Sequence, residues 1–355
     1  MKAALFHEYG PPDVLKFQDW PDPVPRAGEV RIKVHAATVN RVLDVALRRG
    51  AQTQREPVMP CIPGVDCAGL VDMIGPGVTR WKIGDKVAGA GTMPLNVVAE
   101  DGLAAYTGPK GMMGVKRPGG FAQYVYLPWN AVVHHVPKGV SPELAGLVTP
   151  MANGIEWSLF EGKVGYNDVV LIQGPGQQGL SQTVICKQAG AKQIIITGTS
   201  KDHARLEVAK KLGADVTIDV NAEDPLQRIM EVTGGRGVDV VLDCTAGAGT
   251  IPIMLGIEAL KRKAGRIVVQ GEMPEFPNFP IGKMTTKYIT MYSARGHSYL
   301  ACELALQQLA SQRFPLDLVT THKFGLNEVD LAIKSVGNKE GGVKDVIHAS
   351  LMPWL

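Results

Sequence analysis

Cysteine is scarce in this sequence, and no two cysteines are spaced as a metal-binding pair. The chain of 355 residues has five, at Cys61, Cys67, Cys186, Cys244 and Cys302. Their number is odd and none lies in CxxC spacing, which argues against a disulfide framework and against a zinc knuckle. We therefore expect reduced thiols and a cytoplasmic protein.

Long apolar runs and dense clusters of one charge are also missing. The N-terminal ten residues lack the apolar core of a signal peptide, and no run of about 18 apolar residues follows. The formal net charge is +3, without a concentrated basic stretch. These absences predict no membrane partner and no nucleic-acid partner. What is present is an ordinary globular composition, 45% hydrophobic and 20% charged, in a chain long enough for two domains.

The most informative stretch is a glycine-rich turn between an apolar run at 169–172 and a helical pattern. Its residues are Gly174, Gly176 and Gly179, with Gln177 and Gln178 inside the turn. Strand, glycine turn and helix in this order are typical of a dinucleotide-binding unit. The first glycine makes the tight turn, the second lets the backbone approach a pyrophosphate, and the third lets the helix pack closely. The helix start offers free N–H groups to phosphate, which favours a ligand over an empty turn.

From residue 167 onward, strand and helix patterns alternate. The expected strands are 168–173, 193–197, 216–219, 238–243 and 266–270, with a sixth near 289–292. The expected helices are 179–190, 203–213, 224–233 and 250–262. Alternation of this kind predicts a parallel sheet covered by helices on both faces.

The first 150 residues predict short strands instead. Strand patterns occur at 3–6, 30–34, 68–71, 85–87 and 121–126, and a short helix at 41–50 ends at Gly50. This spacing favours a compact, barrel-like β domain. Residues 90–120 are rich in glycine, methionine and proline and show no period, and a loop of that length is usually functional.

Several motifs, in this order, resemble the medium-chain dehydrogenase/reductase superfamily, which includes zinc alcohol dehydrogenases and zinc-free quinone oxidoreductases. They are Lys2-Ala-Ala, Pro63–Gly69, Gly84–Val87, Gly120–Val125, Ala145–Thr149 and the turn at 174–179. The resemblance covers nearly the whole chain. It implies an α/β Rossmann domain with a parallel six-stranded sheet at residues 155–295. It also implies a GroES-like β-barrel catalytic domain at residues 1–154, to which residues 296–355 return.

The chain departs from the zinc enzymes that it resembles. Where they carry a cysteine, it has Thr38-Val39-Asn40-Arg41; where they carry Gly-His-Glu, it has Gly64-Val65-Asp66; and Thr149-Pro150 stands near their third ligand. Valine cannot bind a metal, and the stretch 90–120 lacks the four cysteines of the family's structural zinc lobe. We therefore expect no zinc. A site built from His134, His135 or His297 is the alternative, but adjacent strand residues point to opposite faces.

The end of the second expected strand bears on the choice of cofactor. NAD enzymes hold the ribose there with an acid, whereas this chain has Gly198-Thr199-Ser200-Lys201. Without the acid, Thr199, Ser200, Lys201 and Arg205 favour NADP(H) over NAD(H), because a hydroxyl and a cation can bind the 2′-phosphate. The alternative is that Lys201 and Arg205 form the exposed face of a helix.

Further cofactor contacts are expected where strands end, because ligands bind at that edge of open α/β sheets. These candidates are Thr245, Ala246, Gly271, Glu272 and Arg295. Thr149 lies at the forward crossing, near where the family places the nicotinamide. Arg295 lies at the return crossing and could equally form a structural ion pair.

The chemistry implied by the resemblance is hydride transfer, for which Asn40, Asp44 and Tyr106 are the catalytic candidates. Without a metal, hydrogen-bond donors must stabilise the developing oxyanion. This favours a zinc-independent NAD(P)(H)-dependent oxidoreductase acting on a small carbonyl, enone or quinone. The alternatives are an alcohol dehydrogenase for a specialised alcohol or ketone and a non-catalytic nucleotide-binding protein. Family members are commonly oligomers, so we expect a homodimer or homotetramer joined through Tyr288–Tyr292.

Overall fold

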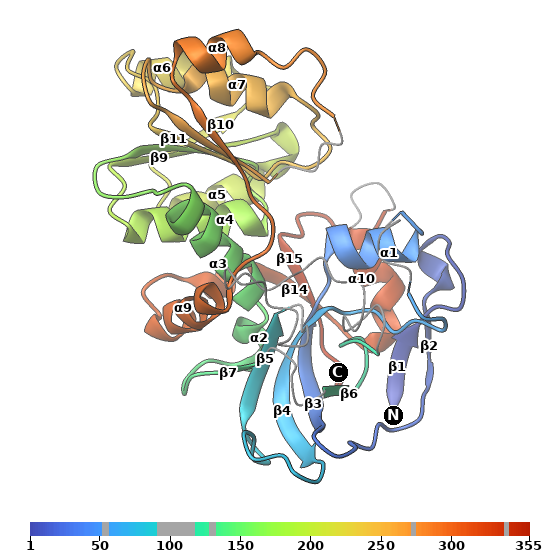
Figure 1. The fold of residues 1–355 in the computed structure, drawn as a ribbon. Coiled ribbons are helices and arrows are strands. Elements are labelled where there is room, and N and C mark those ends of the chain that lie inside the picture. Colours follow the sequence, from blue (N-terminus) through green and yellow to red (C-terminus); the bar gives the residue numbers. More distant parts are fainter. Residues whose placement is uncertain (52–56, 91–117, 128–132, 271–274, 337–340) are drawn as a thin grey trace. The chain divides into compact units, whose positions relative to one another are not determined.

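A computed structural model describes residues 1–51, 57–90, 118–127, 133–270, 275–336 and 341–355 (Figure 1). These residues form two compact units. The parallel-sheet unit consists of Pro150–His297 and Arg313–Val319. The discontinuous unit consists of Met1–Thr149, Ser298–Gln312 and Thr320–Leu355. None of the helices in the described part of the chain is long and apolar enough to cross a membrane.

The parallel-sheet unit has six parallel strands, as the sequence predicted. They are β8 (Val169–Gln173), β9 (Gln193–Gly198), β10 (Val216–Asp219), β11 (Val240–Asp243), β12 (Arg266–Val269) and β13 (Thr290–Ser293). Their order across the sheet is β10-β9-β8-β11-β12-β13. The order reverses between β8 and β11, which is the point where open α/β sheets bind ligands.

Helices cover both faces of this sheet, because its central strands are apolar on both sides. On one face lie α4 (Gln177–Gln188) and α5 (His203–Lys211); on the other lie α6 (Pro225–Val232), α7 (Ile251–Ala259) and α8 (Ile281–Thr286) (Figure 1). The helix starts follow local chemistry. At α6, the carboxylate of Asp224 accepts a hydrogen bond from the Gln227 amide at 3.0 Å, and Pro225 occupies the first turn.

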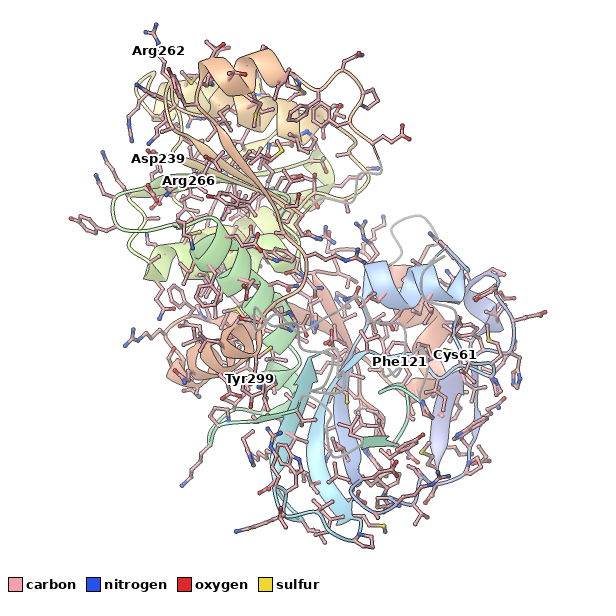
Figure 2. The ribbon with its side chains drawn as sticks, viewed as in Figure 1. Cys61, Phe121, Asp239, Arg262, Arg266 and Tyr299 are labelled. Atoms are coloured by element: carbon pink, nitrogen blue, oxygen red, sulfur yellow. The ribbon has the colours of Figure 1, made fainter. Side chains whose placement is uncertain are left out.

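Ion pairs secure the edge of this sheet where the strands begin. Asp239 accepts a hydrogen bond from the Val169 amide at 2.9 Å and pairs with Lys261 at 2.9 Å. Arg266, which lies near Asp239 (Figure 2), pairs with Asp168 at 2.8 Å. Burial opposes ionisation of Asp239, but the Val169 amide and Lys261 outweigh it and hold the pKa of Asp239 below its usual value. The end of the sheet where the strands begin is therefore structural, and the glycine-rich turn lies at the other end, where the strands finish.

The discontinuous unit is built on a seven-stranded sheet. Its strands are β3 (Val30–Thr38), β4 (Asp66–Ile74), β5 (Lys86–Ala90), β6 (Tyr124–Leu127), β7 (His134–His135), β14 (Thr320–Phe324) and β15 (His348–Leu351). The strand order is β14-β15-β3-β4-β5-β7, and β6 also pairs with β3. A separate antiparallel pair joins β1 (Lys2–Leu5) and β2 (Lys16–Asp19). Segment Thr320–Leu355 therefore completes this sheet with β14 and β15 and adds helix α10 (Val329–Val336), and Ser298–Gln312 adds helix α9 (Tyr299–Ser311).

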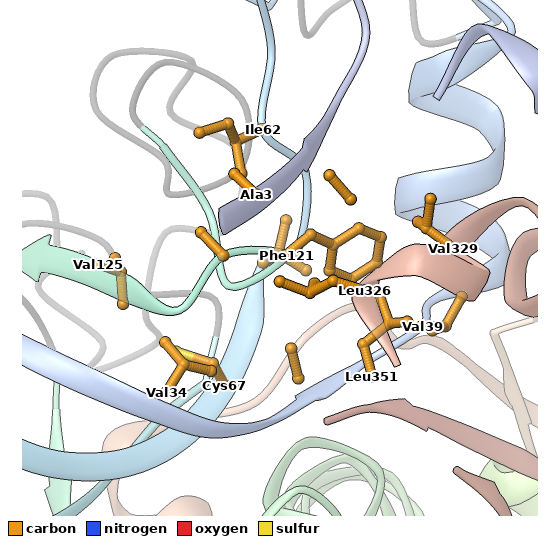
Figure 3. Close-up of a cluster of buried hydrophobic side chains, with 14 of the residues drawn as sticks. Ala3, Val34, Val39, Ile62, Cys67, Phe121, Val125, Leu326, Val329 and Leu351 are labelled. Atoms are coloured by element: carbon orange, nitrogen blue, oxygen red, sulfur yellow. The ribbon is translucent and has the colours of Figure 1, made fainter. Parts of the chain in front are cut away.

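Phe121 is the centre of the apolar core in this unit. Its ring is fully buried and lies among side chains from β1, α10 and β15, including Ala3, Val329 and Leu351 (Figure 3). Burying a phenylalanine side chain stabilises a fold by roughly 1.5–3 kcal/mol. The Phe121 amide also donates to the Pro63 carbonyl oxygen at 3.0 Å. The core thus holds the segment that includes Gly64 and Val65.

Candidate functional site

The glycine-rich turn follows β8 and begins α4, and each of its glycines meets a different constraint. Gly174 has a φ of +93°, in the left-handed region that favours glycine. At Gly179, a Cβ would lie only 2.0 Å from the Gly174 carbonyl oxygen, so any side chain is excluded. At Gly176, a Cβ would meet no atom within 4 Å. The turn therefore has no room for a side chain at Gly179, whereas the space beside Gly176 is open.

This open position matches the place where a pyrophosphate approaches the backbone of a dinucleotide-binding turn. Gly176 is the N-cap of α4, a helix of 12 residues, so its start presents N–H groups and a positive dipole. Beside it, Oε1 of Gln178 is buried and has no hydrogen-bond partner in the described part of the chain. The open backbone at Gly176 and the helix start fit the diphosphate of a nicotinamide cofactor, whereas the carbonyl oxygen of Gln178 is an acceptor and needs a hydrogen-bond donor.

The strand ends bring several predicted contacts to the edge that carries this turn. The register pairs Gln173 with Thr197 and with Asp243, so these residues end their strands at the same level. Thr245 then packs against the turn, since a Cβ on Gly174 would lie 3.3 Å from its backbone. The Thr245 hydroxyl donates to the Asp243 carboxylate at 2.7 Å, which fixes its orientation.

The remaining predicted contacts differ in their surroundings. Ala246 is exposed three residues beyond Asp243, and Arg295 is exposed two residues beyond β13. Thr149 belongs to the discontinuous unit, and its buried hydroxyl has no partner among the described residues. Gly271 and Glu272 lie outside the described residues, as does the catalytic candidate Tyr106.

The turn after β9 is organised by Asp202. Its carboxylate accepts hydrogen bonds from the Thr199 amide at 3.0 Å and from the Thr199 hydroxyl at 2.7 Å. It also pairs with Arg205 at 2.9 Å. Ser200 and Lys201 are exposed between them. The negative charge of Asp202 is therefore held within its own loop and is offset by Arg205.

Asn40 and Asp44 form a second cluster, in the discontinuous unit. The fully buried Asp44 carboxylate accepts from the Asn40 amide at 2.8 Å and from the Gly64 amide at 3.0 Å. The Asn40 side-chain oxygen accepts from the Leu43 amide at 3.0 Å. Burial raises the pKa of Asp44 to about 7, although the two amides favour the charged form. Asp44 thus joins the turn at 40–44 to the loop at Gly64.

The donor atoms in this region do not fit a zinc ion. Val65 is fully buried and offers no ligand atom. Cys61 and Cys67 are nearby buried thiols, and burial raises the pKa of each to about 12. Among the residues that the structure describes, no three His, Cys, Asp or Glu side chains come together as metal ligands.

The histidines considered as alternative ligands differ in their contacts. His134 is buried and pairs with Glu303 at 2.5 Å, whereas its neighbour His135 is exposed, as the strand pattern predicted. His297 is buried in the parallel-sheet unit and lies 2.8 Å from the side-chain oxygen of Asn153. Each imidazole therefore has surroundings of its own.

Comparison with known proteins agrees with this architecture. Residues 26–138 match the family model of the alcohol dehydrogenase GroES-like domain, and residues 179–311 match that of zinc-binding dehydrogenases. A probable alcohol dehydrogenase of Mycobacterium tuberculosis is 32% identical over 82% of this chain and 84% of its own. The chain belongs to the medium-chain dehydrogenase/reductase superfamily. A sorbitol dehydrogenase of Halalkalibacterium halodurans is 29% identical over 96% of this chain and 97% of its own.

A solved NAD-dependent alcohol dehydrogenase superposes on this member of the superfamily with a TM-score of 0.84. The match covers 99% of both chains at 26% identity. The GroES-like and Rossmann folds expected from the sequence are thereby confirmed. The protein is an NAD(P)-dependent oxidoreductase that uses a nicotinamide cofactor and acts on a small molecule.

Two features of the site escaped the sequence analysis. The first is the role of Asp202, although Thr199 and Asp202 are spaced as a capping box, a pattern that the sequence contains. The second is the bond between Asp44 and Gly64, which lie 20 residues apart. No local pattern indicates this second contact, because it depends on how the β4 segment packs.

Proposed function

We propose that this enzyme transfers hydride between NADP(H) and a small carbonyl, enone or quinone without zinc. The observation that carries the proposal is the buried Val65, which stands where related enzymes have a zinc-binding histidine. A family match to zinc-binding dehydrogenases does not establish whether this chain binds zinc, so the proposal rests on the ligand atoms that its residues offer.

Asn40 is proposed as the donor that stabilises negative charge on the substrate oxygen. The nicotinamide supplies or accepts the hydride, and the protein must bind, orient and stabilise the substrate. The side-chain oxygen of Asn40 accepts from the Leu43 amide, and the side-chain nitrogen, which is the hydrogen-bond donor of this group, is the atom proposed to face the substrate oxygen. Asp44 fixes the Asn40 backbone and is proposed to position this group. Tyr106 remains a candidate proton donor.

The preference for NADP(H) is supported by the turn after β9. Gly198 ends the strand without an acid, and the carboxylate of Asp202 is engaged by Thr199 and Arg205. Ser200 and Lys201 are exposed, and they can offer a hydroxyl and a positive charge to a 2′-phosphate. A 2′-phosphate would therefore meet a cation where an NAD enzyme presents a carboxylate.

A second candidate function is the oxidation of a specialised alcohol or the reduction of its ketone. The names of the relatives, sorbitol dehydrogenase and probable alcohol dehydrogenase, support it. In this reaction too, the absence of a Lewis acid would place the stabilisation of the oxygen on hydrogen-bond donors.

We also propose a homodimer or homotetramer. Strand β13 is the outermost of its sheet, so its free edge can pair with a second copy. Tyr288, two residues before β13, has an exposed fraction of 64%. Size-exclusion chromatography with light scattering tests this, and a monomeric mass would refute it.

The experiment that tests the function is metal analysis of the purified protein together with a substrate panel. Carbonyls, enones, quinones and alcohols are assayed with NADPH and NADH, with and without a chelator. Metal-free protein that consumes NADPH on an enone supports the proposal. One equivalent of zinc together with chelator-sensitive alcohol oxidation would refute zinc independence.

A further inference from the structure

The end of β9 has no room for a side chain. A Cβ on Gly198 would lie 2.8 Å from Cγ of Pro175 and 3.2 Å from its Cδ. Gly198 does not adopt a positive φ, so its backbone conformation is one that other residues also adopt. Only space therefore restricts this position to glycine.

The obstacle is rigid. Pro175 is the residue between Gly174 and Gly176 of the glycine-rich turn, and its ring cannot rotate away as a flexible side chain can. The Gly174 amide donates to the Thr197 carbonyl oxygen at 3.1 Å, which holds the turn against the end of β9. The ring and the strand end therefore cannot separate without losing this hydrogen bond.

We infer that Pro175 is a specificity-determining residue that acts through Gly198. Its ring excludes every side chain from the end of β9, including the acid that would bind the ribose hydroxyls of NAD and repel a 2′-phosphate. The inference rests on the proposed NADP(H) preference. The inference adds that Pro175 of the glycine-rich turn, and not only the residue at the end of β9, determines which cofactor is preferred.

Asp202 does not substitute for the excluded acid. Its Cβ lies 3.1 Å from the position of a Gly198 Cβ, but its carboxylate is turned toward Thr199 and Arg205. A contact of 3.1 Å needs only a small shift of the neighbour. The contact with the proline ring is thus the stronger restriction.

A double-mutant cycle tests the coupling. Dissociation constants for NADH and NADPH are measured by calorimetry on the full chain for the wild type, P175A, G198D and the variant with both substitutions. We expect P175A to weaken both cofactors alike, because the turn loses its rigid residue. G198D alone is expected to weaken both by about tenfold or more. The double variant is expected to recover affinity for NADH and to shift the NADH/NADPH affinity ratio toward NADH by about tenfold or more.

G198A and its combination with P175A form the matched control, since alanine adds the Cβ without a charge. P175A should rescue the unfolding midpoint and cofactor affinity of G198A, and this measurement remains available if G198D does not fold. The coupling is overturned if the effects of the substitutions at 175 and 198 are additive, or if G198D alone gains NADH as well as the double variant does. A wild type that prefers NADH would refute the proposed function, whereas the alanine cycle would still measure the contact.

Discussion

The glycine-rich turn holds two backbone segments close together by one means, and the Asn40–Gly64 cluster, which consists of Asn40, Asp44 and Gly64, does so by another. In the turn, side chains are absent: a Cβ at Gly179 would lie 2.0 Å from a carbonyl oxygen. In the cluster, one buried carboxylate accepts the amide hydrogens of Asn40 and Gly64. The turn requires that no side chain be present, whereas the cluster requires that the Asp44 carboxylate keep its hydrogen bonds to both amides. Substitutions should therefore affect the two regions in different ways.

The largest effect is expected at the closed position of the turn. Valine at Gly179 would collide with the Gly174 carbonyl, which belongs to backbone and cannot rotate away. We expect G179V to lower stability by about 3 kcal/mol or more and to abolish measurable cofactor binding. Thermal unfolding and NADPH titration measure both effects. The control is G165A, because a Cβ at Gly165 would meet nothing within 4 Å. A G179V protein with wild-type unfolding and binding would contradict the close approach.

The effect next in size is expected at Asp44. Alanine there leaves the amides of Asn40 and Gly64 without their acceptor in a buried place, which costs about 2–3 kcal/mol. D44N keeps one acceptor oxygen and should lose less. Chemical denaturation with and without chelator measures this loss. If a chelator destabilised the wild type as much as D44A does, a metal would be joining these segments and our account of Asp44 would be wrong.

The sequence predicted the turn but not the cluster, and the reason is physical. The three glycines of the turn lie within six residues, between patterns that are each local, so the fingerprint and the six-stranded sheet were predictable. The sequence suggested a catalytic role for Asp44, but its complete burial and its hydrogen bond to the Gly64 amide depend on a segment 20 residues away. The absence of an acid at Gly198 was visible in the sequence, whereas the proline ring that excludes it was not.

The open position of the turn should separate binding from folding. In G176A, the added methyl group meets none of the described atoms within 4 Å, so we expect the unfolding midpoint to stay near that of the wild type. If the pyrophosphate approaches at this point, the methyl group should weaken cofactor binding by about tenfold, or about 1.4 kcal/mol. Unchanged affinity would place the diphosphate elsewhere, and a large loss of stability would show that Gly176 is a structural position like Gly179.

In the wild type the smallest effect is expected from pH, because two buried groups of the discontinuous unit titrate in opposite senses. Burial raises the pKa of Asp44 to about 7 from 3.8, so the folded state binds more protons between these values and stability falls as pH rises. Burial lowers the pKa of His348 to about 4 from 6.5, so the unfolded state binds more protons and stability rises with pH. Between about pH 4 and pH 6.5, the two contributions therefore oppose each other.

Replacing either Asp44 or His348 should reveal how the other residue alone makes stability depend on pH. Stability of D44N is expected to rise more steeply from pH 4 to 6.5 than that of the wild type, by roughly 1 kcal/mol per pH unit. H348Q should change the slope by a similar amount in the opposite direction, because Asp44 then acts alone. Denaturant unfolding at several pH values measures these slopes, and G176A is the control that should keep the wild-type profile. If D44N and H348Q both ran parallel to the wild type, neither group would titrate as its burial requires. The Asn40–Gly64 cluster would then depend on pH no more than the glycine turn does.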